Sequence, residues 1–264
     1  MFFQARQLHV RYGRREILHG IGFEAKAGEV TVIAGPNGSG KTTLMRALCG
    51  DVEMTGDVVL NGRALDRYAP GALARTRAVL AQETALAFPF TVAEVVGLGM
   101  ASISGTMPDA AARAGRIAEA LARVDLDGFS GRFCQELSGG ERQRVQLARV
   151  LCQIWEPMTA EGPRWLLLDE PVSSLDIRHQ LTIMDIARDF ARRGGGVIAV
   201  MHDLNLTAMY ADHVTFLANG HVAASGTPAE TMTDGLLADV YGCRLRVGQV
   251  PDRVQFVLPQ TAVG

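Results

Sequence analysis

Gly35-Pro36-Asn37-Gly38-Ser39-Gly40-Lys41-Thr42 is the stretch that decides the fold of this chain. It follows the apolar run Glu29–Ala34, which has the pattern of a buried strand, and it leads into Lys41–Cys49, which has the pattern of a helix. Its glycines let backbone N–H groups approach an anion, and the helix N-terminus favours negative charge at the same place. The stretch therefore predicts a phosphate-binding loop rather than an ordinary glycine-rich turn.

The residue types in this loop predict its contacts with a nucleoside triphosphate. The Lys41 ammonium would reach the β- and γ-phosphates, and the Thr42 hydroxyl would bind Mg²⁺. Thr43 would lie near the α-phosphate. The residues of the loop predicted to bind ATP are Gly35, Pro36, Asn37, Gly38, Ser39, Gly40, Lys41, Thr42 and Thr43.

A second glycine-rich stretch, Leu137-Ser138-Gly139-Gly140-Glu141, predicts another anion site at the start of a helix. It offers the Ser138 hydroxyl, exposed N–H groups and the positive end of a helix dipole. The chain already has one phosphate loop, so a second site is explained if two copies pair head to tail. Ser138, Gly139 and Gly140 of one copy would then complete the ATP site of the other. The alternative is a helix capped by Ser138 with no ligand.

An acidic pair, Asp169-Glu170, ends the apolar run Trp165–Asp169. Asp169 is predicted to hold Mg²⁺ through its water shell, as in other phosphate-loop NTPases. Glu170 is predicted to polarise the water that attacks the γ-phosphate. Taken alone, such a pair is more often a charge pair at a helix N-terminus, so the interpretation depends on the other motifs.

Composition narrows the partners and the compartment. The 264 residues are 48% hydrophobic, which is enough for a full core. The net charge of -2 shows no basic excess, so no nucleic-acid partner is expected. None of the four cysteines belongs to a Cys-x-x-Cys pair, which is typical of reduced thiols in a cytosolic protein. No apolar run is long enough to span a bilayer, so a role at a membrane would require a partner.

Short apolar runs alternate with helical patterns, which predicts an α/β fold. Val79–Gln82, Trp165–Asp169 and Val197–Met201 have the near-continuous apolarity of strands that are covered on both faces. Nearer the N-terminus, three runs are short or alternate between apolar and polar residues, which predicts an antiparallel sheet beside the parallel core. These runs are Leu8–Tyr12, Ile21–Ala25 and Val58–Leu60.

A helical subdomain is expected at about residues 91–160, inserted in an ATPase domain that spans residues 1–226. Within it, Asp109–Val124 carries apolar side chains at helical spacing. The proline- and glycine-containing segment 153–164 is expected to form an irregular connection.

Residues 227–264 are expected to form a C-terminal extension packed on the core. Leu236–Tyr241 is predicted to form a short helix. Leu245–Val250 and Val254–Leu258 are predicted to pair with each other around Pro251-Asp252.

Together these motifs resemble those of the ABC-type ATPases, over nearly the whole chain. The resemblance implies a RecA-like phosphate-loop NTPase core, with an N-terminal antiparallel β subdomain and a helical subdomain. Ser173-Ser174-Leu175-Asp176 resembles the D-loop of this superfamily, with Asp176 at its key position.

The same resemblance assigns roles to three residues that carry little information alone. Gln82 would be the Q-loop glutamine, which senses Mg²⁺ and the attacking water. His202 would be the switch histidine that contacts the γ-phosphate. Tyr12 would stack on adenine. Without the resemblance, a lone Gln is usually a surface residue, a lone His after a strand is usually structural, and Tyr is common in sheets.

Within the superfamily, the chain resembles the ATP-binding subunits of bacterial importers that take up haem, iron-siderophores and cobalamin. It most resembles the haem-importer ATPases, in segments such as Ala78–Glu83, Phe88–Val92 and His202–Leu206. One departure is Val172, because the family usually has Thr after Asp-Glu-Pro.

The resemblance implies a peripheral protein at the cytoplasmic face of the bacterial inner membrane, working as a homodimer beneath two permease subunits. A periplasmic substrate-binding protein would act with it only indirectly. ATP and Mg²⁺ would be the cofactors, Glu170 the base and His202 the switch. The Gln82 region would transmit dimer closure to the permease.

Several alternatives remain open at this stage. The same role in ferric-siderophore or cobalamin import fits the motifs, and so does an exporter subunit. A DNA-repair ATPase would normally carry a coiled coil or zinc insertion, and a translation factor would normally carry two cassettes; neither feature is found. A phosphate-binding module without turnover would not need Asp169, Glu170 and His202.

Overall fold

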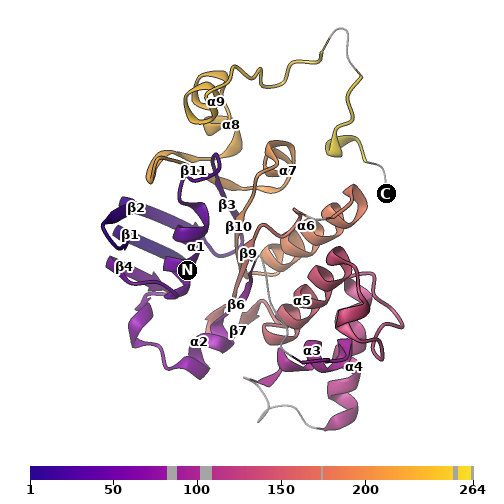
Figure 1. Cartoon of the computed structure of the whole chain (residues 1–264). Helices are drawn as coiled ribbons and strands as arrows, with labels where there is room; N and C mark the ends of the chain where they lie inside the picture. Colours follow the sequence, from indigo (N-terminus) through magenta and orange to yellow (C-terminus); the bar gives the residue numbers. More distant parts are fainter. Residues whose placement is uncertain (82–87, 102–108, 174, 252–254, 263–264) are drawn as a thin grey trace.

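The computed structural model describes residues 1–81, 88–101, 109–173, 175–251 and 255–262 (Figure 1). Its centre is a six-stranded sheet with the strand order β12-β11-β3-β10-β9-β6. Neighbouring strands are parallel except at β11 and β12, which are antiparallel. The strands are β3 (Val30–Ala34), β6 (Arg77–Leu80), β9 (Trp165–Asp169), β10 (Gly196–Val200), β11 (His213–Ala218) and β12 (His221–Gly226). The predicted α/β core is confirmed, with strand ends shifted slightly.

A second sheet is antiparallel and has the order β2-β1-β4-β5. Its strands are β1 (Phe2–Tyr12), β2 (Arg15–Lys26), β4 (Met54–Leu60) and β5 (Arg63–Ala64). The predicted antiparallel sheet is confirmed, although its first two strands are longer than the sequence pattern indicated. Figure 1 shows this sheet beside the central sheet, with α1 (Lys41–Cys49) next to it.

The two faces of β9 show how the central sheet is covered. Leu166 and Leu168 belong to a buried cluster shared with the helices α5 (Gly139–Gln153) and α6 (Ile177–Arg192). Trp165 and Leu167 belong to the other cluster, shared with α1 and the antiparallel sheet. Because both faces are buried, a strand of this kind must be apolar at every position, as the sequence pattern requires.

The helical subdomain contains α3 (Val92–Leu98), α4 (Ala110–Arg123) and α5, with the short helix η3 (Cys134–Glu136) before α5. The helix predicted at Asp109–Val124 is confirmed as α4, whose N-cap is Asp109. Residues 153–164, predicted to be irregular, instead include a small hairpin of β7 (Met158–Thr159) and β8 (Gly162–Pro163). Two-residue strands carry too little periodicity to be read from sequence.

The chain after β12 forms α8 (Pro228–Thr231) and α9 (Asp234–Tyr241), and α9 includes the predicted helix Leu236–Tyr241. Leu237 and Val240 of α9 are buried in the main core cluster. The predicted pairing of Leu245–Val250 with Val254–Leu258 is wrong, because the described residues of both segments lie in no strand. Figure 1 shows this segment extending from α9 before the chain returns, and there the Gln260 Nε2 donates to the Asn205 carbonyl (3.0 Å).

The remaining helices are short. They are η1 (Leu65–Arg67), α2 (Pro70–Thr76), α7 (Leu204–Tyr210) and η4 (Pro259–Thr261). Across the described ranges, no helix is long and apolar enough to cross a membrane.

Gly196 tests how tightly the central sheet is packed against Trp165. A Cβ at Gly196 would lie 2.4 Å from the Trp165 ring, whose side chain is fully buried and cannot move freely. We expect Gly196→Ala to lower the free energy of unfolding by about 1–3 kcal/mol in urea titrations.

The matched control is Gly115→Ala in α4, where a Cβ would meet nothing within 4 Å. This control should instead raise stability by about 0.5–1 kcal/mol, because Gly is a poor helix former. Equal effects of the two changes would contradict the packing described.

Candidate functional site

The predicted phosphate loop lies between the end of β3 and the start of α1. Gly35, Gly38 and Gly40 have φ values of 144°, 77° and 105°, in the region that favours glycine. A Cβ at Gly35 would lie 2.2 Å from the Leu217 carbonyl oxygen, and one at Gly40 would lie 2.7 Å from Leu18 Cδ2. A Cβ at Gly38 would meet nothing within 4 Å. The loop is therefore closely backed at both ends and open in the middle.

Lys41 begins α1 and is buried against the loop. Its Nζ donates to the carbonyl oxygens of Gly35 and Pro36, both at 2.9 Å. Burial lowers the pKa of Lys41, while the nearby carboxylates of Glu170 and Asp169 act in the opposite direction. The lysine is thus folded over the loop and held near two acidic groups, where it can reach phosphate oxygens.

Asp169 is the last residue of β9, and the burial of its side chain favours binding of a cation. The residue is buried, and its Oδ1 has no hydrogen-bond partner among the described residues. Burial first, and then the neighbouring Glu170, raise the pKa of Asp169 to about 6, against the lowering effect of Arg46 and Lys41. A buried carboxylate oxygen without a partner is costly unless a cation binds it. Carboxylate oxygen is also a ligand that Mg²⁺ prefers, so the residue fits its predicted role.

Glu170 follows Asp169 in a strained backbone conformation. Its φ of 52° is unusual for a residue with a side chain and costs on the order of 1–3 kcal/mol. The turn is held because the Glu170 N–H donates to the Val200 carbonyl (3.2 Å) and the Gln143 Nε2 donates to the Glu170 carbonyl (3.2 Å). The strained turn directs the carboxylate toward His202.

His202 follows β10 and contacts Glu170 directly. Its Nε2 lies 2.7 Å from Glu170 Oε1. The His202 side chain is 41% exposed, whereas that of Glu170 is 15% exposed. The next residue, Asp203, caps α7 by accepting from the N–H groups of Asn205 (2.7 Å) and Leu206 (2.9 Å). The backbone at His202 is therefore held in place by the capped helix, and part of the imidazole ring is exposed to solvent.

Ser138, Gly139 and Gly140 stand at the start of α5, as the sequence indicated. Ser138 caps the helix: its Oγ accepts from the Glu141 N–H (3.3 Å), and its own N–H donates to Glu141 Oε2 (2.7 Å). Ser138 and Gly139 are exposed, and a Cβ at Gly139 would meet nothing within 4 Å. No hydrogen bond joins this segment to the phosphate loop within the described part of one chain. The helix start is thus free to meet a ligand presented from outside the chain.

Asp176 and Tyr12 occupy exposed positions. Asp176 caps α6 by accepting from the His179 N–H (3.0 Å), and this bond together with the His179 ring lowers the pKa of Asp176. Tyr12 ends β1 and is 47% exposed, so a face of its ring is available for stacking. Gln82 and Ser174 lie outside the described residues, so their predicted roles stay predictions.

The family model described as ABC transporter matches residues 18–173. The chain belongs to the ABC transporter family.

Two curated relatives and one solved structure place the chain within this family. The Hemin import ATP-binding protein HmuV of Mesorhizobium japonicum is 56% identical over 98% of this chain and 99% of its own length. The protein of the same name from Ruegeria sp. is 57% identical over 99% of both chains. A structure of the ATP binding subunit of an ABC transporter has a TM-score of 0.78 at 23% identity, covering 92% of this chain and 98% of its own. That likeness supports the ABC ATPase fold.

Sequence reasoning missed two glutamines of this ABC ATPase. Gln143 of α5 donates to the carbonyls of Glu170 and Pro171 (2.8 Å for Pro171), which joins the helix that begins after Ser138 to the turn at Glu170. Gln180 of α6 donates to the carbonyls of Val172 and Leu175, which supports the backbone at these two residues. For Gln143, the one signal in the sequence was its position on the helix that Ser138 caps. Val172, the departure from the family pattern, is buried.

The raised pKa of Asp169 predicts a measurable dependence of stability on pH. The pKa of Asp169 in the folded state lies above its unfolded value, so the folded state binds the proton more tightly than the unfolded state does. The free energy of unfolding therefore falls as the pH rises from about 4 to about 6, where Asp169 loses its proton. Without Mg²⁺ and nucleotide, we expect Asp169→Asn to be more stable than the native chain by about 1–3 kcal/mol at pH 7. The difference should nearly vanish at pH 4.

Urea unfolding at both pH values measures this difference. Asp66→Asn, at an exposed position of η1, is the matched control and should show no such gain. If Asp169→Asn gave the same stability as the native chain at pH 7, the buried carboxylate would not carry the proposed cost.

Proposed function

We propose that this chain hydrolyses ATP to power the import of haem through a membrane permease. The observation that carries the proposal is identity of 56% and 57% with two hemin import ATP-binding proteins over 98% and 99% of the chain. This similarity includes the C-terminal extension as well as the nucleotide-binding motifs. It therefore extends beyond the family match at residues 18–173.

The arrangement of side chains supports ATP hydrolysis. Lys41 and the open backbone of the loop would hold the phosphates, which are then close to Asp169 and Glu170. Asp169, Thr42 and Gln82 would hold Mg²⁺, which neutralises charge on the phosphate oxygens when bound. Glu170 would orient the attacking water and accept its proton.

The bond between His202 and Glu170 supports a switch role for the histidine. At 2.7 Å, the imidazole occupies one oxygen of the carboxylate that must act as base. A γ-phosphate that competes for His202 Nε2 would release Glu170 Oε1 for the water. Because the His202 side chain is more exposed than that of Glu170, the histidine is the partner that can turn toward a ligand.

The exposed start of α5 supports a site completed by a second copy. In a head-to-tail homodimer, Ser138, Gly139 and Gly140 of one chain would bind the ATP held by Lys41 of the other. Asp176 would lie at the interface, as the D-loop. Closure would require ATP, and hydrolysis would let the dimer reopen.

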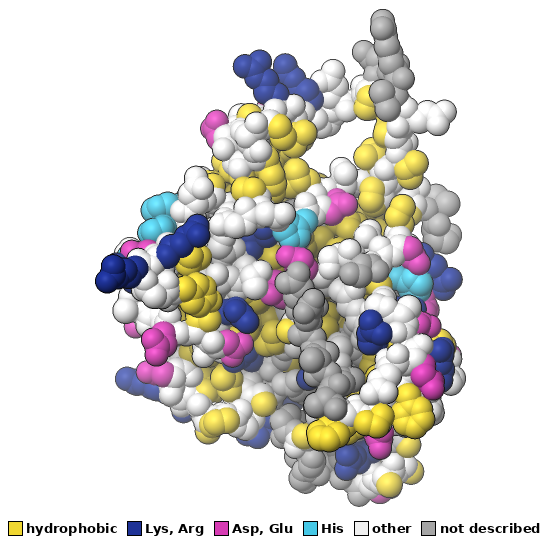
Figure 2. Space-filling view, in the orientation of Figure 1, with side chains coloured by type: hydrophobic (Ala, Val, Ile, Leu, Met, Phe, Trp, Pro, Cys, Tyr) yellow, Lys and Arg dark blue, Asp and Glu magenta, His cyan; other side chains and the backbone are white. Residues whose placement is uncertain are grey.

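An exposed apolar patch supports a protein partner. Phe88 is 67% exposed, Leu98 52% and Phe133 44%. The Cys134 N–H donates to the Phe90 carbonyl (2.9 Å), so the segments that carry Phe133 and Phe88 lie side by side. Figure 2 shows hydrophobic side chains gathered over the helical subdomain, at the lower right. Such patches mark interaction sites. In the homodimer, the patch of each copy would dock one of two permease subunits at the cytoplasmic face of the bacterial inner membrane. A periplasmic binding protein would act only indirectly.

Glu170→Gln tests the proposed function. In a strain lacking this gene, we expect the native chain to restore haem uptake and Glu170→Gln to fail. The purified variant should bind ATP and dimerise, but hydrolyse it at least about 100-fold more slowly, because the base is lost. Uptake of haem and turnover of ATP are the two measurements.

Three controls separate the parts of the proposal. Glu119→Gln, at an exposed carboxylate of α4, should leave uptake and turnover unchanged. Lys41→Ala should weaken ATP binding. A ferric siderophore and cobalamin, offered in parallel, identify the substrate: loss of either one instead of haem would keep the mechanism and reject haem. Unchanged turnover in Glu170→Gln would reject Glu170 as the base.

A further inference from the structure

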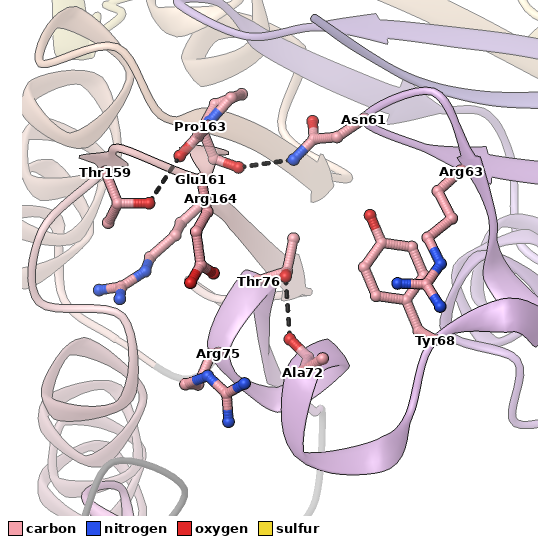
Figure 3. Close-up of a pocket in the computed structure, with 11 residues that line it drawn as sticks. Asn61, Arg63, Tyr68, Ala72, Arg75, Thr76, Thr159, Glu161, Pro163 and Arg164 are labelled. Atoms are coloured by element: carbon pink, nitrogen blue, oxygen red, sulfur yellow. Dashed lines mark hydrogen bonds between the residues drawn. The ribbon is translucent and has the colours of Figure 1, made fainter. Parts of the chain in front are cut away.

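A pocket of about 260 Å³ lies near the start of β9, and Figure 3 shows the residues that line it. Three separate segments form it: the turn between β4 and β5 with the following η1, the helix α2, and the hairpin β7–β8. None of the motifs used for ATP hydrolysis lines it.

The frame of the pocket is fixed by hydrogen bonds. Asn61 Nδ2 donates to the Pro163 carbonyl (2.8 Å), and Asn61 Oδ1 accepts from Trp165 Nε1 (3.0 Å). These two bonds join the β4–β5 turn to the hairpin and to β9. Tyr68 donates to the Leu60 carbonyl, and Thr76 donates to the Ala72 carbonyl. Because these wall groups are already paired, the frame needs no ligand to hold its shape.

The charged side chains of the pocket are bonded to different degrees, and the Arg63 guanidinium donates to the Arg67 carbonyl. Arg63, Arg75, Arg164 and Glu161 line it, giving an excess of positive charge. The side chains of Arg75 and Glu161 form no hydrogen bond or ion pair within the part of the chain that is described. The Arg164 side chain donates only to the Glu156 carbonyl there (3.3 Å).

Arg164 is partly buried and has charges of both signs around it. Burial is the main cause that lowers the pKa of Arg164; Glu156 and Glu161 oppose the shift, and the like charges of Arg116 and Arg75 add to it. Arg63 differs, since its guanidinium lies over the Tyr68 ring, 4.8 Å from the centroid. The guanidiniums of Arg75 and Arg164 thus line the same pocket with N–H donors that no described residue accepts.

We propose that this pocket binds a phosphate-bearing anion, either a free small molecule or a lipid headgroup. Guanidiniums bind phosphate oxygens through paired N–H donors in a fixed fork. A planar carboxylate fills one such fork, whereas a phosphate group has enough oxygens to accept from Arg75 and Arg164 together. The excess of positive charge in the lining matches a dianion.

The position of the pocket separates this site from the ATP site. Thr76 directly precedes β6, and Arg164 directly precedes β9. β6 and β9 are parallel neighbours, with Arg77 opposite Trp165. Asp169 lies at the other end of β9, about 17 Å away at the usual rise per residue. An anion in the pocket would therefore bind at the beginning of the strand whose end carries Asp169.

Binding is best measured in a Lys41→Ala background, which weakens the ATP site. Inorganic pyrophosphate, by calorimetry, tests the free anion, and sedimentation with phosphatidic acid vesicles against phosphatidylcholine vesicles tests the headgroup. Arg75→Gln combined with Arg164→Gln should weaken binding of whichever probe binds by at least about tenfold. Glu161→Gln should strengthen it several-fold, because a like charge is removed.

A charge-matched control replaces Arg113 and Arg192, both exposed and outside the pocket, with Gln. It should leave the affinity nearly unchanged. An equal loss in this control, or no binding of either probe, would overturn the proposal. If the Arg75 and Arg164 double variant does not fold, Glu161→Gln becomes the deciding variant, because Glu161 is exposed and its replacement does not disturb the core. An affinity of Glu161→Gln for the probe that is unchanged or weaker would then overturn the proposal.

Discussion

The parallel pairing of β3, β10 and β9 is the constraint on which the rest of the structure depends. Parallel strands end at the same edge of a sheet, so the phosphate loop after β3, the acidic pair at the end of β9 and His202 after β10 are brought together. The pairing is stable because all three strands are buried on both faces. The site is thus a consequence of strand order, because each of its residues lies at or shortly after the end of a strand.

The same edge of the sheet carries three features that lower the stability of the fold when no ligand is bound. Asp169 is buried with an unpartnered oxygen, Glu170 adopts a strained φ, and Lys41 is buried against its own loop. Each of these features opposes folding when nothing is bound. Binding of a cation and phosphates would satisfy Asp169 and Lys41 together, so ligand affinity and fold stability are linked.

Much of the fold and site could be predicted from sequence because the signals were local. The run Glu29–Ala34, the glycines after it and the helix that begins at Lys41 each have a recognisable pattern, and the structure confirms all three. The hairpin β7–β8 was missed because two-residue strands have no periodicity. Gln143 was missed because its partners, Glu170 and Pro171, are distant in sequence. The strand pairing predicted after Gly242 was wrong because alternation alone cannot supply a neighbouring strand.

The central claim is that one chain holds only half of each ATP site, and a mixture of two defective chains tests it most directly. Lys41→Ala removes the lysine from one half-site, and Ser138→Arg blocks the other. In a head-to-tail dimer of the two variants, one composite site keeps both native residues. ATP hydrolysis is measured for each variant alone and for the two after mixing. The account predicts little hydrolysis by either variant alone and recovery in the mixture; a mixture no more active than the sum of its parts would contradict the shared site.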